Sequence, residues 1–267
     1  MAPPPLQPSA IIMAAGKGTR MNSDLPKVMH PVAGRPMVHW VVDAAFEAGA
    51  GTVVLVVGHG AETVEAAFAG ERRDVRFVLQ QPQLGTGHAV DQARPLFEQG
   101  RLGAQCLVLC GDGPLIRAET LRTLLGAHRA ASAGATLATG VLPDPSGYGR
   151  IVRTPAGGLA RIVEEKDASA EERAIREVNP SYYCFDTAAL FGALRRVDNR
   201  NRAGEYYLTD VFPLLAAEGR PVVVVDAVPA EDVQSINTPA QLADVDRILR
   251  ARRDAAGSAR PAPAHRG

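Results

Sequence analysis

The amino-acid sequence predicts an α/β fold, in which helices flank a mostly parallel β-sheet and a small antiparallel subdomain extends one edge. Continuous apolar, β-branched runs recur along the chain, as expected for strands that are buried on both faces. Helical patterns alternate with these runs in the first half, which indicates layered βαβ units. Between about residues 146 and 185 the pattern changes to short alternating segments, which are typical of antiparallel strands.

Each expected element rests on a local pattern. In residues 35–49, Val38, Val41 and Val42 belong to an apolar stripe at helical spacing, and Gly49 is placed to end the helix. Residues 117–131 repeat this pattern, and a last helix is expected near residues 238–253. The apolar runs that predict strands are residues 10–15, 52–58, 75–80, 105–112, 135–142 and 221–228.

The length of 267 residues suits one α/β domain with a small appendage. We expect a disordered tail over residues 1–9, one folded domain over residues 10–250, and a second disordered tail over residues 251–267. The first residues have neither the charge nor the apolar stretch of a signal peptide, and no run reaches membrane-spanning length.

Composition narrows the classes of partner. The 29 Lys and Arg residues balance the 29 Asp and Glu residues, so no overall field attracts nucleic acid or an anionic membrane. Any affinity for anions must therefore be local. Cys106 and Cys110 lie on one face of a strand and about 13 Å apart, which is too far for a disulfide. Reduced, buried thiols in a cytoplasmic protein are the expectation.

A glycine-rich, positively charged loop, AAGKGTRMNSDLPK, follows the first strand. Gly16 and Gly18 allow positive φ and a close approach of the backbone to an anion. A dinucleotide-binding fingerprint would need a third glycine at Met21, and a P-loop would need Gly-Lys-Ser/Thr. The remaining interpretation is a phosphate-wrapping loop that carries Lys17, Arg20 and Lys27. Ligands of open α/β sheets bind beyond the carboxyl ends of the strands, where this loop is expected to lie.

Several segments carry a resemblance to a known family. GKGTRMNSDLPK is similar to the G-x-G-T-R-x(n)-P-K signature of sugar-phosphate nucleotidylyltransferases. Over residues 10–250 the chain resembles the uridylyltransferase domain of bacterial bifunctional N-acetylglucosamine-1-phosphate uridylyltransferase/glucosamine-1-phosphate acetyltransferases. The resemblance implies a Rossmann-like sheet of the nucleotidyltransferase A-type, with a sugar-binding part at about 136–225. The other matching segments are QLGTGHA (83–89), GDGPLI (111–116), GYGRI (147–151), IVEEKDA (162–168), EVN (177–179), GEYYLTD (204–210) and SINT (235–238).

The resemblance implies a Mg²⁺-dependent UDP-N-acetylglucosamine diphosphorylase, which supplies an amino-sugar precursor for the cell wall. UTP and N-acetylglucosamine 1-phosphate would give UDP-N-acetylglucosamine and pyrophosphate. One alternative is another sugar 1-phosphate, such as glucose 1-phosphate, because Asn179-Pro180-Ser181 stands where the family often has Asn-Thr-Gly. A second alternative is a non-catalytic nucleotide-binding regulator. The joint presence of Arg20 and Lys27 with Asp112 argues against it.

Nucleotidyl transfer suggests a role for each charged residue. Arg20 would bind the β- and γ-phosphates, and Lys27 would stabilise charge on the α-phosphate. Asp112 ends an apolar strand and is assigned by the family to Mg²⁺, although such a residue can also cap a turn. Asn237 is expected to be a second metal ligand, beside Thr238, which fits the N-cap of the last helix.

The remaining expected contacts are with the nucleotide and the sugar. The side chains of Gln80 and Gln83, with Gly85 and Thr86, would face the base, and Thr86 fits equally the N-cap of the helix that follows. By resemblance, Gly147, Glu164 and Asn179 hold the amino sugar. The full nucleotide-binding set is Ala14, Ala15, Gly16, Gly18, Gln80, Gly85, Thr86 and Gly111.

The acetyltransferase half of the family is a hexapeptide-repeat β-helix, and no such repeats follow Asn237. We therefore expect no acetyl transfer from acetyl-CoA. Since that β-helix forms trimers in the family, a monomer or a weak dimer is expected for this chain.

Overall fold

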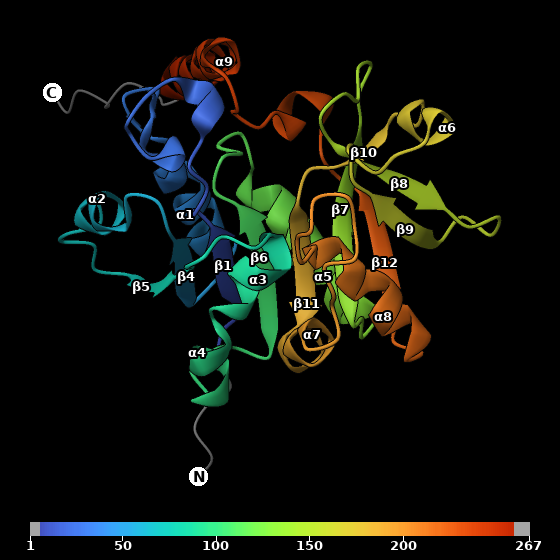
Figure 1. Cartoon of the computed structure of the whole chain (residues 1–267). Coiled ribbons are helices and arrows are strands. Elements are labelled where there is room, and N and C mark those ends of the chain that lie inside the picture. The colour runs from blue at the N-terminus through green and yellow to red at the C-terminus, as the bar shows by residue number, and fades with distance from the viewer. Residues whose placement is uncertain (1–5, 259–267) are drawn as a thin grey trace, which may run out of the picture.

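The computed structural model describes residues 6–258, in which helices cover both faces of a central β-sheet (Figure 1). The main sheet has the order β5-β4-β1-β6-β11-β7, and β12 also pairs with β7. All of these strands are parallel except β11, which is antiparallel to both of its neighbours. The mostly parallel sheet is thus confirmed. Its strands are β1 (Ser9–Met13), β4 (Thr52–Val57), β5 (Asp74–Leu79), β6 (Gln105–Cys110), β7 (Ala135–Val141), β11 (Tyr182–Asp186) and β12 (Val222–Asp226).

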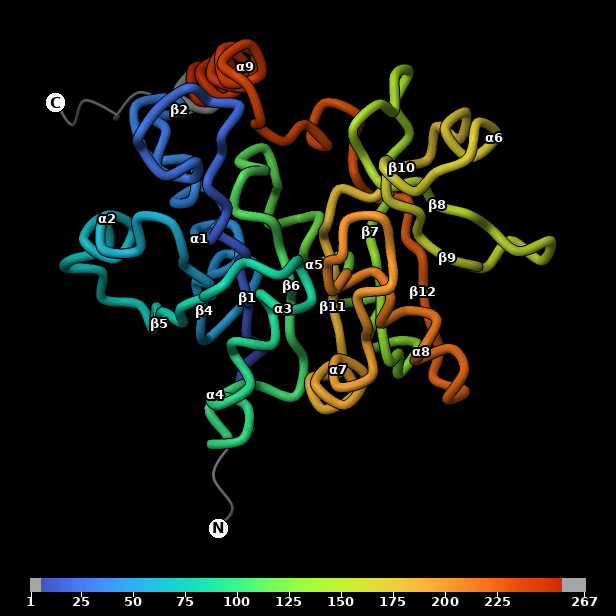
Figure 2. Tube along the Cα trace, viewed as in Figure 1, coloured from blue at the N-terminus to red at the C-terminus, as the bar shows by residue number. Residues whose placement is uncertain are grey.

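A smaller antiparallel sheet shares β7 with the main sheet and has the order β7-β10-β8-β9. It is the antiparallel subdomain that the sequence predicts, and it extends to one side of the molecule in Figure 1. The short helix α6 (Ala170–Arg173) packs against β8. A separate two-stranded pair, β2 and β3, lies beside α9 (Pro239–Ser258) in Figure 2. These strands are β8 (Gly149–Arg153), β9 (Leu159–Val163), β10 (Glu177–Asn179), β2 (Pro31–Val32) and β3 (Arg35–Pro36).

The position of β11 corrects the expectation that every strand between residues 146 and 185 extends the edge. β11 lies inside the main sheet, between β6 and β7. The physical reason is the run YYCF, whose members are all buried. Tyr182 and Cys184 pack into the core on one face of the sheet, and Tyr183 and Phe185 pack into the core on the other. A strand that is apolar on both sides is stable only where both faces are covered.

An irregularity separates β10 from β11. Val178 pairs with Gly140 and Tyr183 pairs with Leu137, so the four residues 179–182, which end β10 and begin β11, lie opposite only residues 138 and 139 of β7. We call this irregular segment the bulge, since extra residues opposite a partner strand bend the chain and redirect its side chains. Ser181 within it has φ 63°, in the left-handed region.

The helices divide between two cores. α1 and α5 cover one face of the sheet with Val38 and Leu121, and α9 adds Val245 to the same core, while α3, α7 and α8 cover the other face. Along β1, Ile12 belongs to the first core and Ile11 to the second, as alternation along a strand requires. The helices are α1 (Met37–Glu47), α2 (Ala61–Ala66), α3 (Thr86–Asp91), α4 (Arg94–Glu98), α5 (Ala118–Ala130), α6 (Ala170–Arg173), α7 (Thr187–Leu194), α8 (Val211–Ala217) and α9 (Pro239–Ser258).

Helix α9 corrects the expected domain boundary at residue 250. It continues through residues 251–258, which were expected to belong to a disordered tail. Two arginines bind the extra turns to the body of the protein. Arg253 Nη1 donates to the Ala33 carbonyl at 2.7 Å, and Arg252 Nη1 donates to the Leu115 carbonyl at 3.2 Å. Figure 2 shows α9 beside β2, at the other end of the sequence.

The start of the chain differs in a smaller way. β1 begins at Ser9, inside the expected N-terminal tail. The rest of the two tails, residues 1–5 and 259–267, lies outside the described residues. None of the helices between residues 6 and 258 is long and apolar enough to cross a bilayer.

Candidate active site

A cavity of about 470 Å³ opens at the carboxyl ends of the parallel strands, where the sequence predicts the site. Its walls come from the loop after β1, the end of β6, the bulge between β10 and β11, and the segment before α9. Most of the expected site residues meet there. Those that line it are Ala15, Gly16, Lys27, Gln80, Gly85, Thr86, Asp112, Gly147, Glu164, Asn179 and Asn237.

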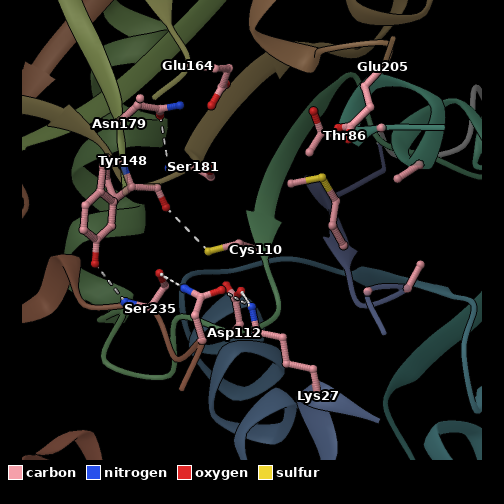
Figure 3. Close-up of a pocket in the computed structure, with 18 of the residues that line it drawn as sticks. Lys27, Thr86, Cys110, Asp112, Tyr148, Glu164, Asn179, Ser181, Glu205 and Ser235 are labelled. Carbon is pink, nitrogen blue, oxygen red and sulfur yellow. Dashed lines mark hydrogen bonds and ion pairs between the residues drawn. The ribbon is translucent and has the colours of Figure 1, made fainter. Parts of the chain in front are cut away.

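Lys27 joins two oxygen-bearing side chains from distant parts of the chain. Its Nζ donates to Asp112 Oδ2, in a short contact, and to Asn237 Oδ1 at 2.6 Å (Figure 3). Asn237 Oδ1 also accepts from Arg20 Nη2 at 2.8 Å. Arg20 is exposed beside the cavity, outside its wall. The four residues that sequence reasoning assigned to phosphates and metal thus form one cluster.

Local backbone structure places these groups. Lys27 begins a 3₁₀ turn directly after Pro26, and a Cβ on Gly18 would lie 2.6 Å from Lys27 Cβ. Gly18 has φ 67°, so glycine is needed there for its conformation as well as for its size. Asp112 follows β6, and its carbonyl accepts from Ile236 N at 2.9 Å. That bond fixes the segment with Asn237 against the end of the sheet.

The start of α9 agrees with the expected capping. Thr238 Oγ1 accepts from Gln241 N at 3.3 Å, and Pro239 is the first helical residue. Gln241 Oε1 accepts from Asn237 N at 2.8 Å. Thr238 therefore caps the helix through its side chain, and the Asn237 side chain is left to point at Lys27.

The donor set suits a small divalent cation. Asp112 offers a carboxylate oxygen and Asn237 an amide oxygen, and both contact one ammonium group, so they are close enough to share one cation. Mg²⁺ prefers hard oxygen ligands, and it commonly takes few from protein and the rest from water and phosphate. Among residues 6–258, no cluster of three or more His, Cys, Asp or Glu side chains offers a metal site of another kind.

The loop after β1 is only partly as expected. Gly16 lies at the cavity wall, and an added Cβ would meet no protein atom within 4 Å, which leaves space for a ligand. Unlike Gly18, however, Gly16 has no positive φ. Ala14 N donates to Val56 O and so extends the sheet, and Lys17 is exposed outside the cavity wall.

The opposite wall carries the residues expected to face a base. Gln80 Nε2 donates to the Gly85 carbonyl at 3.0 Å, which leaves the Gln80 carbonyl oxygen available. Gln83 also lines the cavity and donates to the Ala15 carbonyl. Thr86 does not cap α3 with its side chain, because its hydroxyl accepts from Leu208 N at 3.0 Å. The N-cap of α3 is Gly85.

The residues expected to hold a sugar lie at the far end of the cavity. Glu164 Oε1 accepts from Thr209 Oγ1 at 3.2 Å, and burial raises the pKa of the Glu164 carboxyl, helped by Asp167, Asp210 and Glu205. A desolvated carboxylate that still faces a cavity is a common feature of binding sites.

The other two sugar-site residues are already engaged within the protein. Asn179 Nδ2 donates to the Tyr183 hydroxyl at 2.6 Å, and its Oδ1 accepts from Ser181 N at 3.1 Å. Gly147 N donates to Glu165 Oε2 at 3.1 Å.

Sequence reasoning assigned no binding role to several residues of the cavity wall. Tyr148 accepts from Ser235 N at 3.2 Å through its hydroxyl, Ser181 lies beside Asn179, and Glu205 lies beside Thr86 (Figure 3). Each lies inside or next to a recognised segment, so their position in the segment was the available signal. Cys110 also lines the wall, but burial raises the pKa of its thiol, which keeps it protonated at neutral pH.

Comparison with known proteins agrees with this geometry. Residues 10–207 match the family described as the MobA-like NTP transferase domain. The chain belongs to this family. Membership in the MobA-like NTP transferases confirms the nucleotidylyltransferase resemblance that the motifs indicated.

Similar chains narrow the resemblance further. The chain is 51% identical over 244 residues to the bifunctional protein GlmU of Geobacter metallireducens, covering 91% of this chain and 51% of that protein. It is 48% identical over 243 residues to the bifunctional protein GlmU of Geobacillus sp. WCH70, covering 91% and 52%. The chain therefore spans about half the length of these curated relatives.

Solved structures confirm the fold of this MobA-like NTP transferase. The apo form of a UDP-glucose pyrophosphorylase superposes with a TM-score of 0.75 at 16% identity, over 92% of this chain and 99% of that chain. A UDP-glucose complex of a UDP-glucose pyrophosphorylase gives a TM-score of 0.72 at 17% identity, with the same coverage. At this identity the likeness concerns the fold alone.

Proposed function

We propose that this chain transfers UMP from UTP to N-acetylglucosamine 1-phosphate. A phosphate oxygen of the sugar phosphate attacks the α-phosphorus of UTP, the bond from that phosphorus to the bridging oxygen breaks, and pyrophosphate leaves. The observation that carries the proposal is one cavity with a cationic, metal-compatible end at Lys27 and Asp112 and a polar, sugar-compatible end at Glu164. The products are UDP-N-acetylglucosamine and pyrophosphate.

The positive side chains stabilise the charge that moves during transfer. Phosphoryl-type transfer depends mainly on positioning and charge neutralisation, with little covalent help from the protein. The Lys27 ammonium would stabilise negative charge that grows on the α-phosphate. Arg20, which is exposed beside Asn237, has the forked guanidinium that suits the leaving pyrophosphate.

Asp112 and Asn237 would hold Mg²⁺, which supplies charge neutralisation at the phosphates when bound. The protein's part is to keep both oxygens together. The bond from Ile236 N to the Asp112 carbonyl achieves this, since it fastens the two segments to each other. Lys27 remains beside them as a second positive group.

Uracil and the sugar would occupy opposite ends of the cavity. The free Gln80 carbonyl can accept from the N–H of uracil, and backbone groups near Gly85 can serve its carbonyl oxygens. Gly16 leaves room for the nucleotide. At the other end, the Glu164 carboxylate can accept from sugar hydroxyls.

The relatives support this choice of substrates. The proteins that are 51% and 48% identical to this chain, over 91% of its length, are both named bifunctional protein GlmU. In this proposal the chain acts in the cytoplasm, and its product is an amino-sugar precursor for envelope synthesis.

The test is a pyrophosphate-release assay in which each common ribonucleoside triphosphate is paired with several sugar 1-phosphates. UTP with N-acetylglucosamine 1-phosphate should give the highest kcat/KM, and Asp112→Asn should abolish release. A higher kcat/KM with glucose 1-phosphate would transfer the assignment to that sugar. Tight UTP binding without release for any pair would instead identify a nucleotide-binding regulator.

A further inference from the structure

Ser181 has a backbone conformation that a serine rarely adopts. Its φ of 63° lies in the left-handed region, which disfavours every residue with a side chain and suits glycine. It sits in the bulge between β10 and β11 and lines the cavity. Strained residues persist where the surrounding structure holds them in place, and they gather at functional sites.

The hydrogen bonds around Ser181 leave its hydroxyl proton unused. Its backbone N–H donates to Asn179 Oδ1 at 3.1 Å. Its Oγ accepts from the Tyr183 hydroxyl at 3.4 Å, which is longer than an ordinary O–H···O hydrogen bond. Among residues 6–258 no acceptor for the Ser181 hydroxyl proton is found. The long hydrogen bond with Tyr183 therefore does not explain why a serine occupies position 181.

A smaller side cavity of about 230 Å³ adjoins the main one, and Ser181 lines both. Glu164 and Glu205 also lie at this junction. The side cavity continues past Tyr183 and Leu208 to Thr209. It is much larger than a single hydroxyl group needs, since a water molecule takes about 30 Å³ of liquid.

The chemistry of these walls matches an acetamido group. Such a group has a carbonyl oxygen that accepts, an N–H that donates and a methyl that is apolar. Ser181 offers a donor, Glu164 offers an acceptor, and Leu208 offers apolar surface in the same space. A bare hydroxyl at the same sugar position would leave the Ser181 donor unpaired and the apolar wall uncovered.

We propose that Ser181 determines sugar specificity, because its hydroxyl donates to the acetamido oxygen of an N-acetylated sugar 1-phosphate in the side cavity. The proposal rests on the proposed function and adds a residue that selects between sugars. The bulge aims the side chain, and the left-handed φ is the conformational cost of placing a hydroxyl at this point.

The test compares Ser181→Ala and Ser181→Gly with the wild-type protein. Both variants should lower kcat/KM for N-acetylglucosamine 1-phosphate roughly three- to tenfold, the range for one lost neutral hydrogen bond. The loss should appear in the KM for this sugar phosphate. The KM for UTP and the lower activity with glucose 1-phosphate should stay unchanged. Equal losses with both sugars, or no loss with either, would overturn the proposal.

A matched control separates strain from recognition. Ser132 also has a left-handed φ, 47°, but it is exposed after α5 and outside both cavities. Ser132→Gly and Ser181→Gly should both raise the melting temperature, since each relieves the same kind of strain. Only Ser181→Gly should change sugar kinetics. If the wild-type protein released no pyrophosphate with any sugar 1-phosphate, the proposed function would fail, and the role of Ser181, which rests on it, would be overturned with it.

Discussion

At the residue scale, Lys27 is the positive group on which the site depends most directly. Its ammonium lies between Asp112 and Asn237, and its side chain is only 13% exposed. A charge held in a partly desolvated place stabilises a developing negative charge more strongly than a charge in water. Exposed Lys17, in the same loop, lacks this setting.

Lys27→Ala should therefore lower kcat by about a hundredfold or more, the usual loss when one transition-state donor is removed. Lys17→Ala is the matched control, which removes an equal charge from the same loop, and it should change kcat little. Steady-state pyrophosphate release measures both. A comparable loss in the two variants would show that the loop acts only through its overall charge.

Asn237→Ala should raise the Mg²⁺ concentration that gives half-maximal activity, because the variant lacks one of the two oxygen ligands. The KM for the sugar phosphate should change much less. A Mg²⁺ titration at saturating substrates measures this. The control is Thr238→Ala, which removes the helix cap and should cost about 1 kcal/mol of stability without changing the titration. An unchanged titration in Asn237→Ala would leave Asp112 as the protein's sole metal ligand.

Glu164 should cost the protein stability at neutral pH. Its pKa in the folded state is raised by burial and by the neighbouring carboxylates, so the folded protein holds this proton more tightly than the unfolded chain does. The protonated Glu164 side chain thus contributes its whole stabilisation below its ordinary pKa. This contribution is lost as the pH rises through the raised pKa of the folded state.

Glu164→Gln should accordingly raise the melting temperature at pH 8, and raise it less at pH 4, while weakening sugar binding. Differential scanning calorimetry at both pH values and the KM for the sugar phosphate measure these effects. The control is Glu65→Gln on the exposed surface of α2, which should change neither. A Gln variant that is less stable at pH 8 would contradict this account.

At the scale of elements, buried Asp232 connects three parts of the chain. Its carboxylate accepts from Arg117 Nε at 2.5 Å, directly before α5, and from Arg252 of α9. Asp232 lies in the 3₁₀ turn (Ala230–Val233) that leads to the segment of Asn237. The last turns of α9 thus brace the segment that carries a metal ligand.

Arg252→Ala should destabilise the protein by about 1–3 kcal/mol, because Asp232 is 1% exposed and would keep only one of its two charged partners. Urea unfolding measures this change. Arg247→Ala, on the exposed side of α9, is the control and should stay within about 0.5 kcal/mol of wild type. If Arg252→Ala were as stable as Arg247→Ala, the buried pair would contribute nothing to stability.

Much of this architecture could be predicted because it depends on local patterns. Apolar runs located the strands, and Thr238-Pro239 located the start of α9. The interior position of β11 could not be predicted, because pairing of Tyr183 with both β6 and β7 depends on which strands reach it through space. The extension of α9 past residue 250 depends on distant partners for Arg252 in the same way. Lys27, Asp112 and Asn237 were expected together. Ser181 stood out only as a departure from the family pattern, and its left-handed conformation could not be predicted, because nothing in the sequence shows a bulge.

At the scale of the whole molecule, the cavity is built by both halves of the fold. Lys27 and Gln80 come from segments that follow the parallel strands β1 and β5, and Glu164 and Asn179 come from the antiparallel subdomain. A ligand that fills the cavity therefore contacts both halves and should stabilise the entire cooperative unit.

UTP with Mg²⁺ should raise the melting temperature. A ligand at a hundred times its Kd adds about 2.7 kcal/mol, and each kcal/mol raises the melting temperature of a chain of this size by about 2–4 °C. Thermal shift measurements with UTP, CTP, ATP and GTP check this, and UTP should give the largest shift. A larger shift with a purine nucleotide would contradict the assignment of Gln80 to uracil.

The interior position of β11 also sets the order in which the chain can fold during synthesis. β5, β4, β1 and β6 have all been made by residue 110, but the next neighbour of β6 appears only at residue 182. At about 5–20 residues per second, the ribosome needs several seconds to make the segment between them. For that time the edge of β6, with buried Cys106 and Val108, has no partner, and open apolar edges invite pairing with other chains. The nascent protein is thus most prone to aggregation at the strand that later lies in the middle of its sheet. Once β11 has been made, it pairs with β6 and covers this open edge.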